Sequence, residues 1–281
     1  MSEQIITFEQ VSYQYADGTM ALNQINLSIE KGKKIALLGN NGAGKSTLFL
    51  LMNGILKPTS GSIFYRGKKL TYKRKEIQQL RQQVGIVFQN SETQLFSSSV
   101  YEDIKYGPKN LHLPIEEIER RVKEVITLTE TESLKDKPPH FLSIGQKKRV
   151  AIAGIVAIDP ELMVLDEPTA GLDPYYSKRT MEILGKINHR NRTVLLSTHD
   201  VDLAYEWADE VIILNNGHLL AQGIPVEVFN QREILEKSHL QKPWMMEVFE
   251  RLQGTNLSNK KYPRSKAELF EMMESIQASF F

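Results

Sequence analysis

A glycine-rich loop between two apolar segments constrains the fold of this chain more than any other feature of its sequence. Residues 39–46 read Gly-Asn-Asn-Gly-Ala-Gly-Lys-Ser and match the phosphate-loop pattern G-x-x-x-x-G-K-[ST] at every fixed position. The apolar run 35–38 before the loop predicts a buried strand, and the run 47–52 after it predicts a helix that Gly54 can close. Strand, glycine loop and helix, in this order, are the setting that a phosphate-binding loop requires.

The residue types in the loop indicate how it would hold a nucleotide. Glycines let the backbone approach the phosphates, and the backbone N–H groups and the helix N-terminus supply positive potential. Lys45 can neutralise charge on the β- and γ-phosphates, and the Ser46 hydroxyl can ligate Mg²⁺. The predicted nucleotide-binding residues of this loop are Gly39, Asn40, Asn41, Gly42, Ala43, Gly44, Lys45, Ser46 and Thr47.

Composition excludes several other classes of protein. The 35 basic and 34 acidic residues leave a formal net charge of +1, which provides no global attraction to nucleic acid. The absence of cysteine excludes a disulfide framework and a thiolate metal site. The longest apolar run, residues 150–158, is far shorter than the roughly 20 residues of a membrane-spanning helix, and the N-terminus lacks the apolar core of an export signal. We therefore expect a chain that neither crosses a membrane nor is exported.

The pattern along the chain predicts an α/β fold. Short alternating stretches in residues 5–30, broken at Asp17-Gly18, predict antiparallel strands, and residues 62–67 are expected in the same sheet. The apolar runs 84–88, 162–165, 194–196 and 211–214 are separated by helical stretches, which is typical of buried parallel strands. Residues 91–157 predict a mostly helical insertion, with helices over 115–129 and from Ser143 onward. Asn216-Gly217 predicts a tight turn in a short strand pair, followed by helices.

Two further motifs lie between the phosphate loop and the later strands. In Leu142-Ser143-Ile144-Gly145-Gln146, Ser143 and Gln146 have the spacing of a capping box, which by itself indicates only an ordinary helix start. About 15 residues later, the run 162–165 ends in Asp166 and Glu167, where open α/β sheets place their ligands. Asp166 can hold the Mg²⁺ shell, and Glu167 can polarise an attacking water.

The phosphate loop, the pentapeptide 142–146 and the acidic strand end, in this order, resemble the nucleotide-binding subunit of ATP-binding cassette (ABC) transporters over most of the chain. The resemblance implies a P-loop NTPase fold with a RecA-like parallel-sheet core, an N-terminal antiparallel β subdomain, an inserted α-helical subdomain and a C-terminal helical extension. It also implies ATP hydrolysis, with ATP and Mg²⁺ as cofactors. We accordingly expect an ATPase domain at residues 1–240, with the helical subdomain at about 91–157, and an extension at 241–281 that contacts a dimer partner. The helix expected at 265–276 in this extension would place Leu269, Met272, Met273 and Ile276 on one face.

The resemblance further implies roles for single residues. Tyr15 is similar to the aromatic residue that stacks on adenine, and Gln89 to the glutamine that links Mg²⁺ to the transmembrane partner. Asp173 resembles the acid that communicates across the dimer, and His199 resembles the γ-phosphate sensor. The expected catalytic residues are Glu167, His199 and Gln89, and the expected metal ligands are Ser46, Gln89 and Asp166.

In the family, the pentapeptide of one subunit faces the phosphate loop of another, so two ATP molecules are clamped between two cassettes. Ser143, Gly145 and Gln146 would then contact the nucleotide of the opposite chain. Hydrolysis removes the γ-phosphate contacts and opens the clamp. Whether the second subunit is a copy of this chain or a related ATPase stays open.

The chain departs from the family pattern at Ile144, where the family has glycine. A β-branched residue keeps the backbone donor but cannot easily adopt left-handed dihedrals. Because Ser143 and Gly145 remain, our hypothesis is that the loop still binds the γ-phosphate. An Ile144→Gly variant with ATPase activity raised on the order of tenfold would identify Ile144 as a brake on turnover.

Residues 88–90, 94–96, 106–111, 147–154 and 221–229 resemble one branch of the family, the ATPases of energy-coupling factor importers, which include cobalt and nickel uptake systems. The resemblance implies a peripheral protein on the cytoplasmic face of the cell membrane that powers uptake of a vitamin or a transition-metal ion. Its partners would be a second ABC ATPase subunit, a transmembrane scaffold protein and a membrane protein that captures the substrate, without nucleic acid. The segment 89–113 would form the groove for the scaffold.

Two alternatives stay open at this point. A cytosolic cassette protein that acts on ribosomes or DNA uses the same clamp without a membrane, but such proteins typically fuse two cassettes or add long coiled coils, which are not seen in this sequence. A small-molecule kinase needs only the phosphate loop and leaves the pentapeptide and His199 unexplained.

Overall fold

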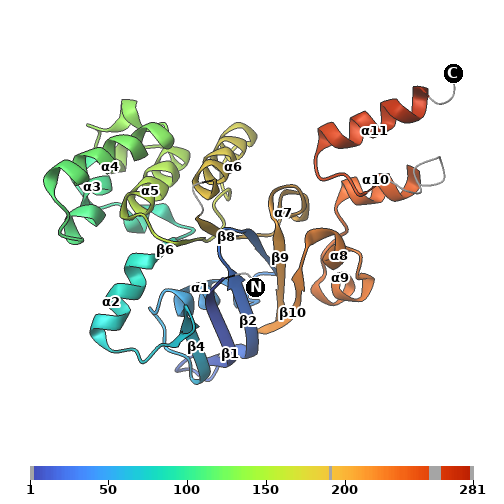
Figure 1. Ribbon diagram of the computed structural model, residues 1–281, viewed down its shortest axis with the longest axis horizontal. Helices are drawn as coiled ribbons and strands as arrows, with labels where there is room; N and C mark the ends of the chain where they lie inside the picture. Colours follow the sequence, from blue (N-terminus) through green and yellow to red (C-terminus); the bar gives the residue numbers. More distant parts are fainter. Residues whose placement is uncertain (1–2, 190–191, 253–260, 279–281) are drawn as a thin grey trace.

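Two β-sheets organise the molecule, which the computed structural model describes at residues 3–189, 192–252 and 261–278 (Figure 1). The four-stranded sheet has the order β2-β1-β4-β5, with strands Met20–Glu30, Gln4–Gln14, Ser60–Tyr65 and Lys68–Lys69. The six-stranded sheet has the order β10-β9-β3-β8-β7-β6, with strands His218–Gly223, Glu210–Asn215, Lys34–Leu38, Thr193–Thr198, Leu162–Leu165 and Val84–Val87. The predicted α/β fold with an antiparallel β subdomain is confirmed.

The four-stranded sheet is antiparallel, and β1 pairs with β2 on one side and with β4 on the other. Its inward side chains, among them Phe8, Leu27 and Ile29, join the same apolar cluster as Phe49 of helix α1, Lys45–Met52. This packing explains the alternating pattern in residues 5–30, because one face of each strand meets the core while the other remains polar.

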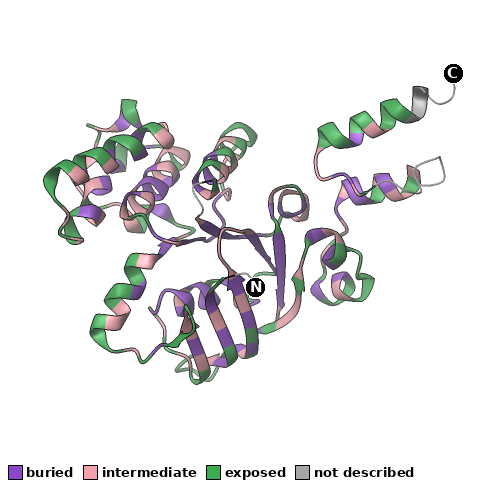
Figure 2. Ribbon diagram, viewed as in Figure 1, coloured by how far each residue is buried: buried purple, intermediate pink, exposed green. Residues whose placement is uncertain are grey.

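The core of the six-stranded sheet is parallel from β9 through β6, and only the edge strand β10 runs antiparallel to its neighbour. Alternate residues of β3 belong to different clusters: Ile35 and Leu37 face the cluster that contains α1, whereas Ala36 and Leu38 face the cluster on the other side. Burial on both faces explains why these strands read as continuous apolar runs and appear buried along their length in Figure 2.

The helical insertion forms a unit with its own apolar cluster, at one end of the molecule in Figure 1. After α2, Arg74–Gln83, and strand β6, a short 3-10 helix at Ser91–Gln94 leads into α3, Val100–Asn110, α4, Ile115–Leu128, and α5, Ile144–Ile158. Ile104, Val122 and Val150 contribute one buried side chain each from the three helices. Both helices predicted in this region are present.

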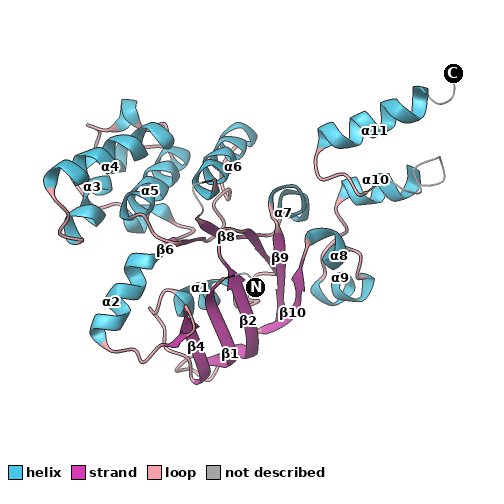
Figure 3. Ribbon diagram, in the orientation of Figure 1, coloured by secondary structure: helices cyan, strands magenta, loops and turns pink. Residues whose placement is uncertain are grey.

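The remaining helices cover the second face of the sheet and extend beyond it (Figure 3). They are α6, Pro174–Asn188, α7, Val201–Trp207, α8, Pro225–Phe229, α9, Arg232–Ser238, α10, Trp244–Leu252, and α11, Lys266–Ala278. None of the helices within the described ranges combines the length and the apolar character needed to cross a bilayer.

The helix predicted near the C-terminus is present, and the apolar residues of its predicted face differ in burial. Leu269 is buried against the core, whereas Met273 is 40% exposed and the neighbouring Phe270 is 56% exposed. Met273 lies one turn beyond Leu269 and remains exposed because α11 contacts this chain near its first turn, through Leu269. The side chain of Ile276, like residues 253–260 and 279–281 of the predicted extension, lies outside the described part of the chain.

Candidate nucleotide site

The register of the parallel strands brings the predicted site residues to one edge of the sheet. Leu165 of β7 is paired with Val87 of β6 and with Leu196 of β8, and Leu38 of β3 is paired with Thr198. The residues that follow these pairs therefore emerge side by side: Gly39 after β3, Gln89 beyond β6 and Asp166 after β7. This edge is the carboxyl end of the strands, where open α/β sheets bind ligands.

Two glycines let the phosphate loop pass close to neighbouring backbone. Gly39 has φ +154°, and a Cβ there would lie 2.4 Å from the carbonyl oxygen of Leu214. Gly44 has φ +102°, and a Cβ there would lie 2.6 Å from the carbonyl oxygen of Ala21. The side chain of Lys45 folds back over the loop and donates to the carbonyl oxygens of Gly39 (2.6 Å) and Asn40 (3.2 Å). The loop thus holds its cation in place beside the expected phosphate path.

The acidic strand end is fixed by hydroxyl groups from two other elements. The Oγ of Ser46 donates to Oδ2 of Asp166 and the Oγ of Ser197 donates to Oδ1, each at 2.6 Å. The backbone N–H of Glu167 donates to the same Ser197 Oγ at 2.8 Å. Glu167 has φ +46°, a left-handed conformation that is unusual for a residue with a side chain and is often found at functional sites. These contacts hold the Asp166 carboxylate and the backbone of Glu167 at the strand end.

His199 lies directly beyond strand β8, next to the second acid. Its Nδ1 is 3.1 Å from Oε2 of Glu167, and its side chain is 79% exposed, whereas Glu167 is buried. The imidazole thus joins the acid on one side and remains open to a bound ligand on the other. The expected water-polarising acid and the expected phosphate sensor are therefore in direct contact.

Tyr15 lies on the other side of the phosphate loop. Its hydroxyl is 2.9 Å from Oγ1 of Thr47, and its ring contacts Tyr13 edge to face, with 5.0 Å between ring centroids. Tyr15 remains 40% exposed and borders a cavity. A cavity of about 460 Å³ extends from this ring to His199; among its lining residues are Tyr15, Asn40, Asn41, Gly42, Ala43, Gly44, Lys45, Ser46, Thr47, Gln89, Asp166, Glu167 and His199.

The pentapeptide residues Ser143, Gly145 and Gln146, together with Asp173, do not line this cavity. Ser143 caps α5: its Oγ accepts from the Gln146 N–H, and its own N–H donates to Oε1 of Gln146 at 3.0 Å. Asp173 caps α6 in the same way, accepting from the N–H of Tyr176 at 2.9 Å. The capping box predicted from the sequence is therefore present.

Ile144 does not adopt the left-handed conformation that would be unfavourable for a β-branched residue. It is the first residue of α5 and is absent from the positive-φ residues of the described chain, so its β-branched side chain meets no backbone conflict. Its side chain is 61% exposed. At Gly145, a Cβ would lie 3.4 Å from Leu172 and 3.7 Å from Tyr176, which are ordinary van der Waals distances.

The oxygen donors at the strand end fit a magnesium ion. The Ser46 hydroxyl and the Asp166 carboxylate lie 2.6 Å apart, and Gln89 lines the same cavity. A hydroxyl, a carboxylate and an amide oxygen, completed by phosphate oxygens and water, are the ligands that Mg²⁺ prefers. No cluster of three or more His, Cys, Asp or Glu side chains suited to a metal occurs among the described residues, so a metal here would depend on the nucleotide.

Two residues of the site were missed by sequence reasoning. Ser197 contacts both acids, and its place one residue beyond the pair Leu165 and Leu196 is visible only in the sheet register. Lys148 of α5 is 1% exposed, and its Nζ donates to the carbonyl oxygen of Gln89 at 2.6 Å. Burial lowers the pKa of this lysine, while the charges of Asp166 and Glu167 oppose that effect. The sequence of α5 does not reveal which of its adjacent lysines, Lys147 or Lys148, is buried.

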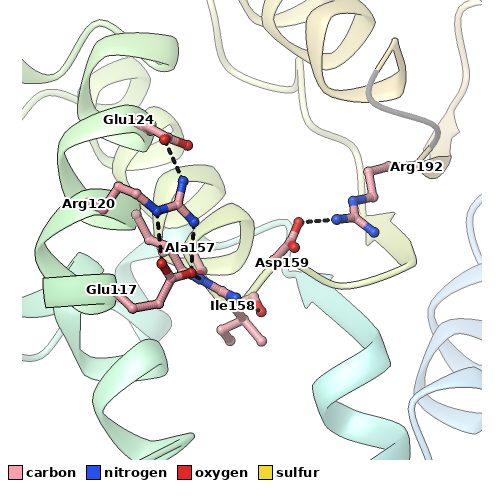
Figure 4. Close-up of polar contacts among 8 residues, drawn as sticks. Glu117, Arg120, Glu124, Ala157, Ile158, Asp159 and Arg192 are labelled. Atoms are coloured by element: carbon pink, nitrogen blue, oxygen red, sulfur yellow. Dashed lines mark hydrogen bonds and ion pairs between the residues drawn. The ribbon is translucent and has the colours of Figure 1, made fainter. Parts of the chain in front are cut away.

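A second cavity, of about 210 Å³, lies near the opposite, N-terminal ends of β7 and β8. Figure 4 shows its arginines: Arg120 is paired with Glu117 and Glu124, and Arg192 is paired with Asp159. Arg121 is paired with Glu117 and donates to the carbonyl oxygen of Ile158 at 3.1 Å. Because these three arginines already have partners, we assign the nucleotide to the cavity at the carboxyl ends of the strands.

Comparison with known proteins decides the family. The ABC transporter family model matches residues 22–170, from the second strand to beyond the acidic strand end. This chain belongs to the ABC transporter family. It is an ATPase of that family.

Several members of the ABC family are similar to this chain over most of its length. The energy-coupling factor transporter ATP-binding protein of Methanocaldococcus jannaschii is 48% identical over 246 residues, which are 88% of each chain. A solved structure of CbiO1 from Clostridium perfringens, described as part of the ABC transporter complex cbiONQ, is 45% identical with a TM-score of 0.76 and covers 88% of this chain and 99% of that one. A dimeric ATP-binding cassette in a post-hydrolysis state with ADP and Pi is 28% identical with a TM-score of 0.72, covering 79% of this chain and 99% of that one. The chain spans 60% of the length of a further ABC relative, from Methanosarcina mazei.

Proposed function

We propose that this chain is the ATP-hydrolysing subunit of an energy-coupling factor importer. The observation that carries the proposal is the strand-end network in which Ser46, Asp166, Ser197, Glu167 and His199 are linked in series beside the phosphate loop. Such a network places a metal-holding acid and a water-polarising acid one residue apart, as hydrolysis of a phosphoanhydride requires. The names of similar proteins support the importer as the setting of this reaction.

The position of each residue in the site determines its role in ATP hydrolysis. Lys45 and the loop N–H groups bind the β- and γ-phosphates, and Tyr15 stacks on the adenine ring. Glu167 accepts a proton from the attacking water, and His199, held beside Glu167, donates to the γ-phosphate. Mg²⁺ held by Ser46, Asp166 and Gln89 would neutralise charge that develops on the phosphate oxygens.

The second half of the site comes from another subunit. Ser143, Gly145 and Gln146 lie at the N-terminus of α5 and outside the cavity, which supports their use on a nucleotide bound by an opposite chain. Asp173, at the start of α6, would transmit the state of one site to the other. Exposed Phe270 and Met273 on α11 support a further dimer contact through the extension 241–281.

A groove on the helical insertion suits the transmembrane scaffold. Phe96 is 65% exposed and Tyr106 is 48% exposed, and their rings are in edge-to-face contact with 4.8 Å between centroids. They border a cavity of about 110 Å³ that Ile155 and Ile158 of α5 also line. Exposed aromatic side chains around an apolar hollow are typical of a site for a partner helix. The groove begins a few residues after Gln89, so docking there can influence the nucleotide site.

The proposed role places the chain on the cytoplasmic face of the membrane as a peripheral subunit. A transmembrane scaffold would be moved by the opening and closing of the ATPase dimer during ATP turnover. A separate membrane protein would capture a vitamin or a transition-metal ion. Purification of the full chain from membranes in mild detergent tests this role. We expect integral membrane partners to copurify, and recovery with ribosomes or DNA and no integral membrane partner would overturn the importer role in favour of a cytosolic cassette protein.

A further inference from the structure

The C-terminal extension, residues 241–281, contacts helix α7, which lies before it in the sequence and begins two residues after His199. Asp200 starts this helix, since its Oδ1 accepts from the N–H of Leu203 at 2.9 Å and its own N–H donates to Oγ1 of Thr198 at 3.1 Å. His199 is therefore set between the end of β8 and the start of α7. Its side chain is 79% exposed and makes a polar contact only with Glu167 among the described residues, so its position depends on that acid and on these two backbone anchors.

Residues 263–264 of the extension bind the middle and the end of α7. Arg264 donates from Nε to the carbonyl oxygen of Tyr205 at 2.9 Å and from a terminal nitrogen to the carbonyl oxygen of Ala208. Its guanidinium also lies over the Tyr205 ring, 5.2 Å from the centroid. The hydroxyl of Tyr205, a fully buried residue, donates to the carbonyl oxygen of Pro263 at 2.8 Å. A cation on the last carbonyls of a helix satisfies them and favours its dipole.

The start of α7 is bound by a different part of the extension. Oδ1 of Asp202 accepts from the backbone N–H of Trp244, the first residue of α10, at 2.9 Å. The extension thus contacts α7 near its first turn, at its middle and at its end. A shift or rotation of α7 breaks at least one of these contacts, so its position, and that of His199, depends on the extension.

We propose that Arg264 is a positioning residue for ATP hydrolysis, acting through α7 on His199. This inference rests on the proposed function, in which His199 contacts the γ-phosphate. Arg264 does not line the nucleotide cavity, so it acts on turnover and not on nucleotide affinity. The extension is then part of the catalytic apparatus as well as an added surface.

Steady-state ATPase kinetics of the full-length Arg264→Ala variant test the proposal. We expect kcat to fall about five- to tenfold while KM for ATP changes less than about twofold, because the phosphate loop is untouched. Arg264→Lys should recover part of kcat, since it restores a cation at the carbonyls of α7. Arg251→Ala, which removes an exposed arginine from α10, is the matched control, and its kcat should equal that of the unmodified chain. Thermal unfolding is measured for each variant. Tyr205→Phe, which loses only the hydroxyl, is a milder second test of the contact between the extension and α7.

Combination with His199→Ala separates the possible failures. If Arg264 acts through His199, Arg264→Ala should lower the residual rate of His199→Ala by less than about twofold. An equal loss of kcat in both backgrounds would overturn the positioning role and leave Arg264 as a stabilising contact only. A full rate in His199→Ala alone would overturn the proposed role of His199 itself. A normal kcat in Arg264→Ala beside an inactive His199→Ala would overturn this inference while leaving the proposed function intact.

Discussion

Single residues carry the hydrolytic chemistry, and Glu167 is the one whose role is most directly testable. Its carboxylate is buried, is held by Ser197 through its backbone and lies beside His199. We expect Glu167→Gln to lower steady ATPase activity by at least about 100-fold, because the amide cannot accept the proton of water. ATP binding and ATP-driven association should persist, measured by equilibrium binding and by size-exclusion chromatography. Glu206→Gln, an exposed change on α7, is the control, and full activity in Glu167→Gln would contradict the role of Glu167 as the base.

Ile144 is a second residue for which the structure gives a definite expectation. Its right-handed, helical backbone and exposed side chain leave the neighbouring donors of Ser143 and Gly145 in place. We therefore expect Ile144→Gly to change kcat by less than about threefold and to lower the free energy of unfolding by at most about 1 kcal/mol, through helix propensity. Phosphate-release kinetics and thermal melts measure the two effects. A rise in kcat of about tenfold, or 1.4 kcal/mol of barrier, would show that the side chain restrains turnover instead.

At the level of elements, the insertion offers a surface that the catalytic core does not need. Phe96, beside α3, is exposed in the proposed docking groove, so Phe96→Asp should not disturb the fold. We expect this variant to lose most of the membrane partners that copurify with the unmodified chain, because a carboxylate in an apolar contact must be desolvated. ATP binding should be unchanged. Ile115→Asp, at another exposed apolar residue at the start of α4, is the matched control and should retain the partners. Equal recovery in both variants would place the scaffold elsewhere.

At the level of the whole molecule, the cavity and the pentapeptide belong to different subunits in the proposed assembly. Gly145→Asp adds a carboxylate at the N-terminus of α5, where it would repel the γ-phosphate bound by the opposite chain. In the Glu167→Gln background we expect this change to abolish ATP-driven association while each subunit still binds ATP. Gly185→Asp, on α6 with open space around the glycine, is the control. Association of the Gly145→Asp variant at the same ATP concentration would contradict a composite site.

The sequence by itself determined the phosphate loop, the acidic strand end and the elements that carry them, because these depend on local residue order. Capping of α5 by Ser143 and Gln146 was equally readable, since a capping box involves residues three positions apart. The tertiary structure alone decided which hydroxyl joins the two acids: Ser197 reaches Asp166 because β7 and β8 are neighbours in register, a pairing of residues 31 positions apart. It also decided that Lys148 turns inward beneath Gln89 and that Arg264 closes α7, a contact spanning 59 positions from Tyr205. Such contacts depend on how distant segments pack, and no local pattern of residues encodes them.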